Sequence, residues 1–86
     1  MARVESNKTI TIQQSSISVT EAFKMVERQA GVSITYQSNV VNRKLRLHLS
    51  LYNATLERVL NEICEQAGLD YSLRDNYVLI RKKHEV

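Results

Sequence analysis

The chain of 86 residues has no proline, no tryptophan and only two glycines, Gly31 and Gly68. Proline and glycine mark most turns and loops, so their scarcity predicts short connections and almost no flexible linker. The single cysteine, Cys64, excludes an internal disulfide and leaves the redox compartment open. No apolar run approaches the roughly 18 residues that span a bilayer, so we expect no membrane insertion by this segment.

What is present is an ordinary globular composition. Hydrophobic residues make up 43% of the chain and charged residues 24%, which favours a folded domain over a disordered segment. A length of 86 residues allows one small domain. The net charge of +3 permits an acidic partner without requiring nucleic acid.

The two ends of the chain differ from its centre. Residues 1–7 are polar and lack the apolar core of a signal peptide. We therefore interpret them as a linker, with Met1 supplied for expression if the native protein is exported. Residues 8–81 form the predicted domain. Residues 82–86 are predicted to be a charged, frayed tail.

One segment of the chain occurs twice. The segment from Ser18 to Val32 recurs 37 residues later, from Thr55 to Leu69. Each copy begins with a hydroxyl residue that suits a helix cap, continues with apolar residues at helical spacing, and closes with Gln-Ala-Gly before its last residue. Glu21 completes a capping box in the first copy, whereas the second copy has arginine at the equivalent position. The repeat predicts two amphipathic helices, each closed by its glycine.

Alternating polar and apolar residues predict strands before, between and after these helices. The predicted strands are 8–13, 32–36 and 45–51, followed by a hairpin of 69–73 and 77–81 around a turn at 74–76. Tyr36, Tyr71 and Tyr77 are predicted to face inward. The order β-α-β-β-α-β-β then predicts an α+β fold of duplicated βαβ units, with two helices sandwiched between two small sheets.

Both copies of the repeat match the pattern of a known family. The second copy reads Asn53 to Leu60, then Ile63, Gln66 to Tyr71 and a closing Tyr77 to Ile80; the first reads Ile10 to Ile12, then Gln29 to Tyr36, where a glycine precedes a strand that ends in an aromatic residue. In this order the segments resemble the secretin and TonB N-terminal short domain, over residues 8–81. The resemblance implies two helices held between two small sheets.

The resemblance also implies a function. Domains of this family lie in the periplasm, at the N-terminus of TonB-dependent outer-membrane receptors, where they signal. Such a domain contacts the periplasmic part of an inner-membrane anti-sigma regulator, and so reports receptor occupancy to a sigma factor. The alternative is the N-terminal domain of a secretin, which docks inner-membrane secretion machinery. The family carries no catalytic residues to transfer, and we expect the isolated domain to be a monomer.

Four basic residues form the most distinctive surface feature and are the candidate partner-binding residues. They are Arg43, Lys44, Arg46 and His48. Strand alternation places Arg46 and His48 on the solvent face, where a merely solvated surface is the ordinary interpretation. The functional interpretation is an electrostatic contact with an acidic partner, which would orient and accelerate association. A nucleic-acid-binding module is a third alternative, although the sequence has neither a GXXG loop nor an aromatic RNP-like strand.

No arrangement of residues in the sequence points to catalysis, a metal or a cofactor. His48 falls within a strand, His84 in the tail and Cys64 on a helix flank, so their spacing does not match a metal site. The sequence also lacks a Ser/His/Asp order, a P-loop and a dinucleotide fingerprint. We therefore expect a binding protein rather than an enzyme. An extended segment of a partner could add to an open sheet edge, and the sequence leaves open which edge is free.

Overall fold

The computed structural model describes residues 9–75 and 77–83. The elements are, in chain order, β1 (Ile10–Ser18), α1 (Val19–Ala30), β2 (Ser33–Thr35), the 3-10 helix η1 (Ser38–Val40), β3 (Arg46–Ala54), α2 (Leu56–Ala67), β4 (Leu69–Leu73) and β5 (Tyr77–Lys82). Their order and the α+β class confirm the fold that the sequence predicts. The predicted linker 1–7, His84 in the predicted tail and Asn76 in the hairpin turn lie outside the described residues.

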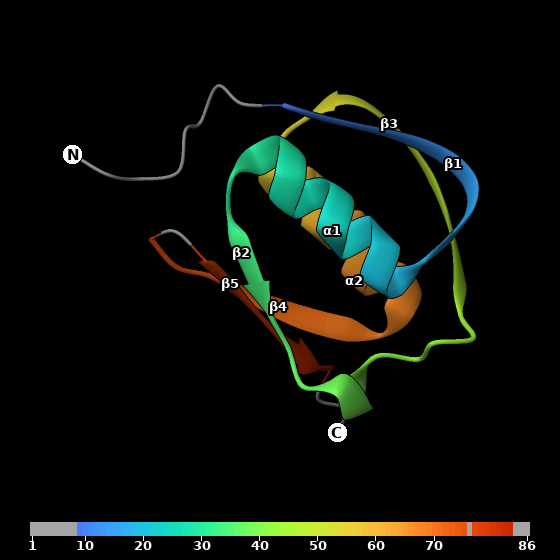
Figure 1. Cartoon of the computed structure of the whole chain (residues 1–86), viewed down its shortest axis with the longest axis vertical. Helices are drawn as coiled ribbons and strands as arrows, with labels where there is room; N and C mark the ends of the chain where they lie inside the picture. The colour runs from blue at the N-terminus through green and yellow to red at the C-terminus, as the bar shows by residue number, and fades with distance from the viewer. Residues whose placement is uncertain (1–8, 76, 84–86) are drawn as a thin grey trace.

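Each sheet takes its strands from both copies of the repeat. β1 pairs antiparallel with β3 in a two-stranded sheet, and the second sheet has the order β2-β5-β4. In this second sheet β2 runs parallel to β5, whereas β4 runs antiparallel to β5. The two helices lie between the sheets, with β1 and β3 on one side and β2, β5 and β4 on the other (Figure 1). The two strands that flank each helix therefore belong to different sheets.

The helices begin and end where the repeat predicts. The hydroxyl of Ser18 accepts a hydrogen bond from the amide of Glu21 at 3.2 Å, and the hydroxyl of Thr55 accepts one from the amide of Arg58 at 3.2 Å. Each helix ends at the glycine of its repeat, with φ of 71° and 70°, in the left-handed region that glycine adopts without a steric penalty. Only half of the predicted capping box forms within the described chain, because the Glu21 carboxylate does not bond back to the Ser18 amide.

Both helices bury their apolar stripes between the sheets. The buried residues are Val19, Ala22, Phe23, Val26 and Ala30 in α1 and Leu56, Val59, Leu60, Ile63 and Cys64 in α2. The apolar residues at helical spacing in the first copy are all buried, as its predicted amphipathic helix requires. In α2, Cys64 is buried although we expected it on the helix flank, and Ala67 is only half-buried. No polar or charged side chain of residues 9–75 and 77–83 is buried, so apolar packing stabilises the core. No described helix is long and apolar enough to cross a membrane.

β1 and β3 are longer than predicted because bulges let their pairing continue past breaks in the alternation. In β1 the register shifts between Gln14 and Ile17, so that two serines lie opposite His48. The polar run at this point resembles a loop in sequence, which is why the predicted strand ends at residue 13. A second shift occurs where Asn53 adopts φ of 52°, a left-handed conformation that asparagine tolerates.

The tyrosines follow the prediction in part. Tyr36 and Tyr71 are half-buried, and the Tyr36 ring lies 5.3 Å from that of Phe23 between centroids. Tyr77 is 41% exposed, so its predicted inward position is wrong. Val78, the next residue of β5, is fully buried and takes the inward position, which leaves Tyr77 on the outer face of the sheet.

Candidate functional site

The structure places the four predicted basic residues along one segment. Arg43 and Lys44 are exposed in the turn that precedes β3, and Arg46 and His48 are exposed on β3 itself. The alternation of β3 was therefore interpreted correctly, since both side chains lie on the outer face of the β1–β3 sheet. Whether these residues contact a partner stays a prediction.

Two of these basic side chains have contacts within the domain. Arg46 donates from Nε to the hydroxyl of Ser16 at 2.9 Å and from Nη2 to the Ser16 carbonyl at 3.2 Å. The Nδ1 atom of His48 lies 3.4 Å from the carbonyl oxygen of Ser15. Both side chains thus hold the bulge of β1, a structural role that the sequence does not reveal because the bulge itself is not predicted.

Two glutamines close the outer edges of the β1–β3 sheet. Gln29 of α1 accepts from the Thr11 amide at 2.9 Å and donates to the Thr11 carbonyl at 3.0 Å. Gln66 of α2 accepts from the His48 amide at 3.0 Å and donates to the His48 carbonyl at 2.8 Å. Each side-chain amide satisfies the outward backbone groups of one strand residue, as a neighbouring strand would. The sequence signal for this pair was the repeated Gln-Ala-Gly, which we interpreted only as a helix end.

The edge of β2 is closed by a carboxylate. Glu27 of α1 accepts a hydrogen bond from the amide of Ile34 at 2.7 Å, on the side of β2 that faces away from β5. Hydrogen bonds to charged acceptors are stronger than those to neutral ones. Three of the four outer strand edges therefore carry a side chain from the core helices.

The edge of β4 has no such side chain. Cys64 occupies the repeat position that corresponds to Glu27, and Tyr71 the one that corresponds to Ile34. The pairing of β4 with β5 fixes which amides face outward. The backbone amide of Arg74 donates to the Tyr77 carbonyl, and the backbone amide of Lys83 donates to the Gly68 carbonyl. Gly68 and Arg74 therefore direct their backbone groups toward β5, and so do the even-numbered residues of β4 between them.

The odd-numbered residues of β4 direct their backbone groups away from the sheet. They are Leu69, Tyr71 and Leu73. Within the part of the chain that the structure describes, no side chain accepts a hydrogen bond from the Tyr71 amide, in contrast to the Ile34 amide of β2. β4 therefore presents an open edge.

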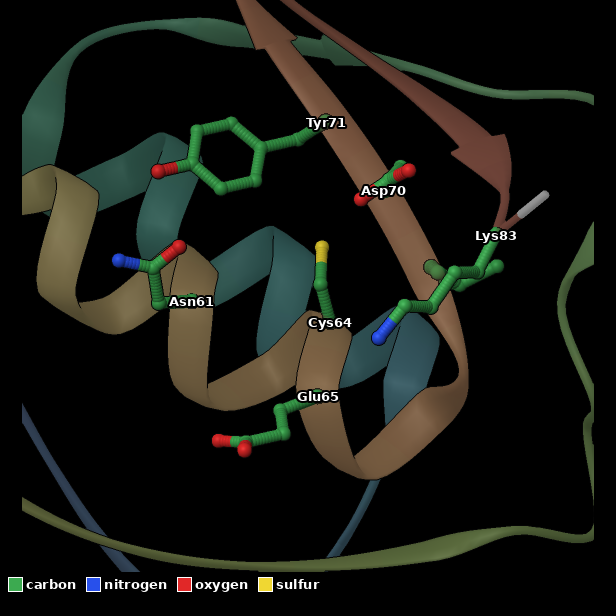
Figure 2. A pocket seen from close by; sticks show the side chains of 7 residues that line it. Asn61, Cys64, Glu65, Asp70, Tyr71 and Lys83 are labelled. Atoms are coloured by element: carbon green, nitrogen blue, oxygen red, sulfur yellow. The ribbon is translucent and has the colours of Figure 1, made fainter. Parts of the chain in front are cut away.

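A groove of about 280 Å³ runs between this edge and α2 (Figure 2). Its lining residues are Asn61, Cys64, Glu65, Leu69, Asp70, Tyr71 and Lys83. The thiol of Cys64 points from α2 toward β4, with Tyr71 toward one end of the groove and Lys83 toward the other (Figure 2). The sequence does not predict this groove, because α2 and β4 are brought together only by the packing of the helix on the sheet.

The thiol of Cys64 and the phenol of Tyr71 are both protonated at neutral pH. Burial, and then the carboxylate of Asp70, raise the pKa of the Cys64 thiol to about 11. Burial, and then the charges of Glu57 and Cys64, raise the pKa of Tyr71. A protonated thiol is a poor nucleophile and a poor metal ligand. In residues 9–75 and 77–83, no three His, Cys, Asp or Glu side chains gather in a way that could hold a metal ion.

Comparison with known proteins places the chain in a family. The model of the family described as FecR, C-terminal, matches residues 15–80. Comparison with curated proteins gives no match. The match contradicts the resemblance to the secretin and TonB N-terminal short domain, which is a different family. That resemblance was based on capped amphipathic helices and alternating strands, which any βαβ unit of this geometry needs, so it predicted the fold and not the family.

The match retains part of the functional expectation. FecR is also a signalling protein of TonB-dependent systems, and its family is a component of anti-sigma regulation. Its C-terminal domain is periplasmic in known systems, whereas nothing supports an outer-membrane parent or a secretin. At the family level this indicates a periplasmic signalling role in the regulation of iron transport. Because the family model covers most of the chain, including both helices and strands of each sheet, this protein belongs to the FecR C-terminal family.

Proposed function

We propose that this domain is the partner-binding module of an anti-sigma regulator in the periplasm. In this role it binds the N-terminal periplasmic domain of a TonB-dependent receptor, and the contact passes receptor occupancy toward a sigma factor. The observation that carries the proposal is the family match over residues 15–80. The mechanism is protein–protein binding without a chemical step.

The proposal exchanges the two sides of the contact that the sequence predicts. The sequence interpretation takes this chain as the receptor domain and an anti-sigma regulator as its partner. The family match supports a position on the regulator side, and we therefore propose the receptor as the partner. The kind of signalling system stays the same, and only the position of this domain in it changes.

The distribution of side chains supports a binding role. Apolar residues are used in the core, and the exposed outer face of the β1–β3 sheet is polar, with Arg46, His48 and Ser50 along β3. The groove beside β4 contains a protonated thiol rather than an activated one. A surface of this kind can recognise a protein partner through backbone groups and charge.

Direct binding tests the proposal. The 86-residue chain is titrated calorimetrically with the purified N-terminal periplasmic domains of the TonB-dependent receptors of its source organism. We expect one receptor domain to bind with a dissociation constant of about 10 µM or tighter, in the range of transient signalling contacts. The N-terminal domain of a secretin serves as the control. Binding to the secretin domain and to none of the receptor domains would contradict the proposal.

A further inference from the structure

The four outer strand edges of the domain differ in one respect. Side chains of the core helices bond to the backbone of β1, β2 and β3, and none within the described chain does so for β4. We propose that the outer edge of β4 accepts an extended, basic segment of the receptor partner as an added strand. This inference rests on the proposed function and names the surface and the kind of segment that it uses.

The backbone of β4 is suited to strand addition. Leu69, Tyr71 and Leu73 each direct one amide donor and one carbonyl acceptor away from β5. An extended segment beside them would bond to these groups and extend the β2-β5-β4 sheet by one strand. At β2 the same addition is opposed by Glu27, which already occupies the amide of Ile34.

The groove beside β4 gives the added strand room for its side chains. In an extended segment alternate side chains point to opposite faces, so every second one would enter the groove of about 280 Å³ between β4 and α2. There it would meet the Cys64 thiol and the ring of Tyr71 (Figure 2). Because both groups are uncharged at neutral pH, these inward side chains should be small and apolar.

The charged residues around the groove indicate which side chains the partner segment should carry at the positions that do not enter the groove. Glu57, Asn61 and Glu65 are exposed and follow one another at a spacing of four residues along α2, so they lie on one face of the helix. Asp70 is exposed on β4, and Lys83 lies at the end of the groove. Carboxylates outnumber cations here, which favours a segment with lysine or arginine beside its apolar residues.

The first copy of the repeat has the opposite charge at the equivalent positions. There the face of α1 beside β2 carries Thr20, Lys24 and Arg28. A second copy of the chain is a poor partner strand for two separate reasons. Pairing of β4 with β4 of another copy would bring two acidic faces together, and pairing of β4 with β2 of another copy would meet the edge that Glu27 closes.

Amide hydrogen exchange of the complex tests the position of the added strand. The 86-residue domain is measured alone and with the receptor domain that binds it. We expect exchange at Leu69, Tyr71 and Leu73 to slow by at least about tenfold in the complex, because their amides acquire acceptors. The amides of Ile34 and Thr11 should not change, since side chains protect them already.

Charge reversal tests the chemistry of the segment, with a matched control in the other copy of the repeat. The double substitution Glu57→Lys with Glu65→Lys should weaken receptor binding by about tenfold or more. The control, Lys24→Glu with Arg28→Glu, changes the equivalent exposed positions beside β2 and should alter affinity by less than about twofold. All four residues are exposed, and circular dichroism checks that each variant remains folded.

Each outcome bears on the inference. If a receptor domain binds but the β4 amides exchange as before, or if reversal at Arg46 and His48 weakens binding while reversal at Glu57 and Glu65 does not, the interface lies elsewhere and the inference is wrong. The proposed function would then still stand. If no receptor domain binds, the proposed function fails.

A peptide probe separates these two failures. It is a nine-residue peptide of alternating lysine and valine, with a glutamate–valine peptide as the control. If the basic peptide slows exchange at the Tyr71 amide and the acidic peptide does not, the result supports an edge of β4 that accepts a basic strand, even where no receptor domain binds. Equal protection by both peptides, or by neither, overturns the inference.

Discussion

The two outer edges of the β2-β5-β4 sheet come from equivalent positions of a repeat, but a helix side chain closes only one of them. At β2 the carboxylate of Glu27 accepts from the Ile34 amide at 2.7 Å. At β4 the equivalent positions are Cys64 and Tyr71, and a buried thiol replaces the carboxylate. A duplicated scaffold can therefore close one edge of a sheet and leave the other available through one residue.

The β1–β3 sheet shows the opposite behaviour, because there the repeat is retained. Gln29 bonds to Thr11 and Gln66 bonds to His48. The two glutamines are 37 residues apart, and so are the two strand residues that they bond to. Open edges favour uncontrolled association, so closing three of them limits where another chain can pair. Of the four outer edges, that of β4 is the one at which the second copy of the repeat does not keep the edge-closing side chain of the first copy.

The largest expected effect concerns the core that both copies share. Phe23→Ala and its repeat equivalent Leu60→Ala each remove a side chain that is at most 1% exposed. We expect the free energy of unfolding to fall by about 3–5 kcal/mol for the first and about 2–5 kcal/mol for the second, measured by urea denaturation. Tyr52→Ala, at a residue that is 73% exposed, is the control and should change it by less than about 0.5 kcal/mol. A large loss in only one copy would show that the two halves do not share one core.

The second effect depends on pH and on the thiol that replaces Glu27. The pKa of Cys64 is about 11 in the folded domain against 9.0 for an ordinary thiol. The unfolded chain loses this proton first, so the stabilisation is complete below about pH 9 and is lost as the pH rises toward about 11, at up to about 1.4 kcal/mol per pH unit. Urea denaturation at several pH values measures the slope, and Cys64→Ala should reduce it. Identical slopes for the two proteins would contradict the assignment to Cys64.

Opening the edge of β2 is the third change. Glu27→Ala leaves the amide of Ile34 without its acceptor, and we expect a loss of about 1–2 kcal/mol in the free energy of unfolding. Exchange of the Ile34 amide should become faster, which would make β2 resemble β4. Thr35→Ala, at an exposed β2 residue with no side-chain hydrogen bond in the described structure, controls for general effects on the strand. Unchanged exchange at Ile34 would mean that Glu27 does not protect this edge in solution.

The smallest effect concerns the two glutamines. Gln29 is half-buried and Gln66 exposed, so water can replace the side-chain amide more easily at Gln66. Gln29→Ala should cost about 1 kcal/mol and Gln66→Ala about 0.5 kcal/mol of stability, measured by thermal denaturation. The amides of Thr11 and His48 should exchange faster in the respective variants. A larger loss for Gln66 would reverse this order and contradict the role of burial.

Sequence reasoning was accurate where local chemistry decides the structure. The capping hydroxyls, the apolar stripes and the closing glycines specify each helix within a few residues of chain, and both helices form as predicted. It was wrong at Tyr77, which is exposed, and at the ends of β1 and β3, where bulges carry the pairing further. The basic residues of the candidate site were placed on the correct face of their strand, although their contacts with the β1 bulge were not foreseen.

By itself the sequence determined the order and type of the two α-helices and five strands, although not the 3-10 helix η1, because helix capping and side-chain alternation act over short distances along the chain. Only the tertiary structure decided that the strands of each copy divide between two sheets, and that three strand edges are closed while that of β4 is open. The reason is that an edge is defined by residues far apart in sequence, such as Gln29 and Thr11, which meet only when the helices pack between the sheets.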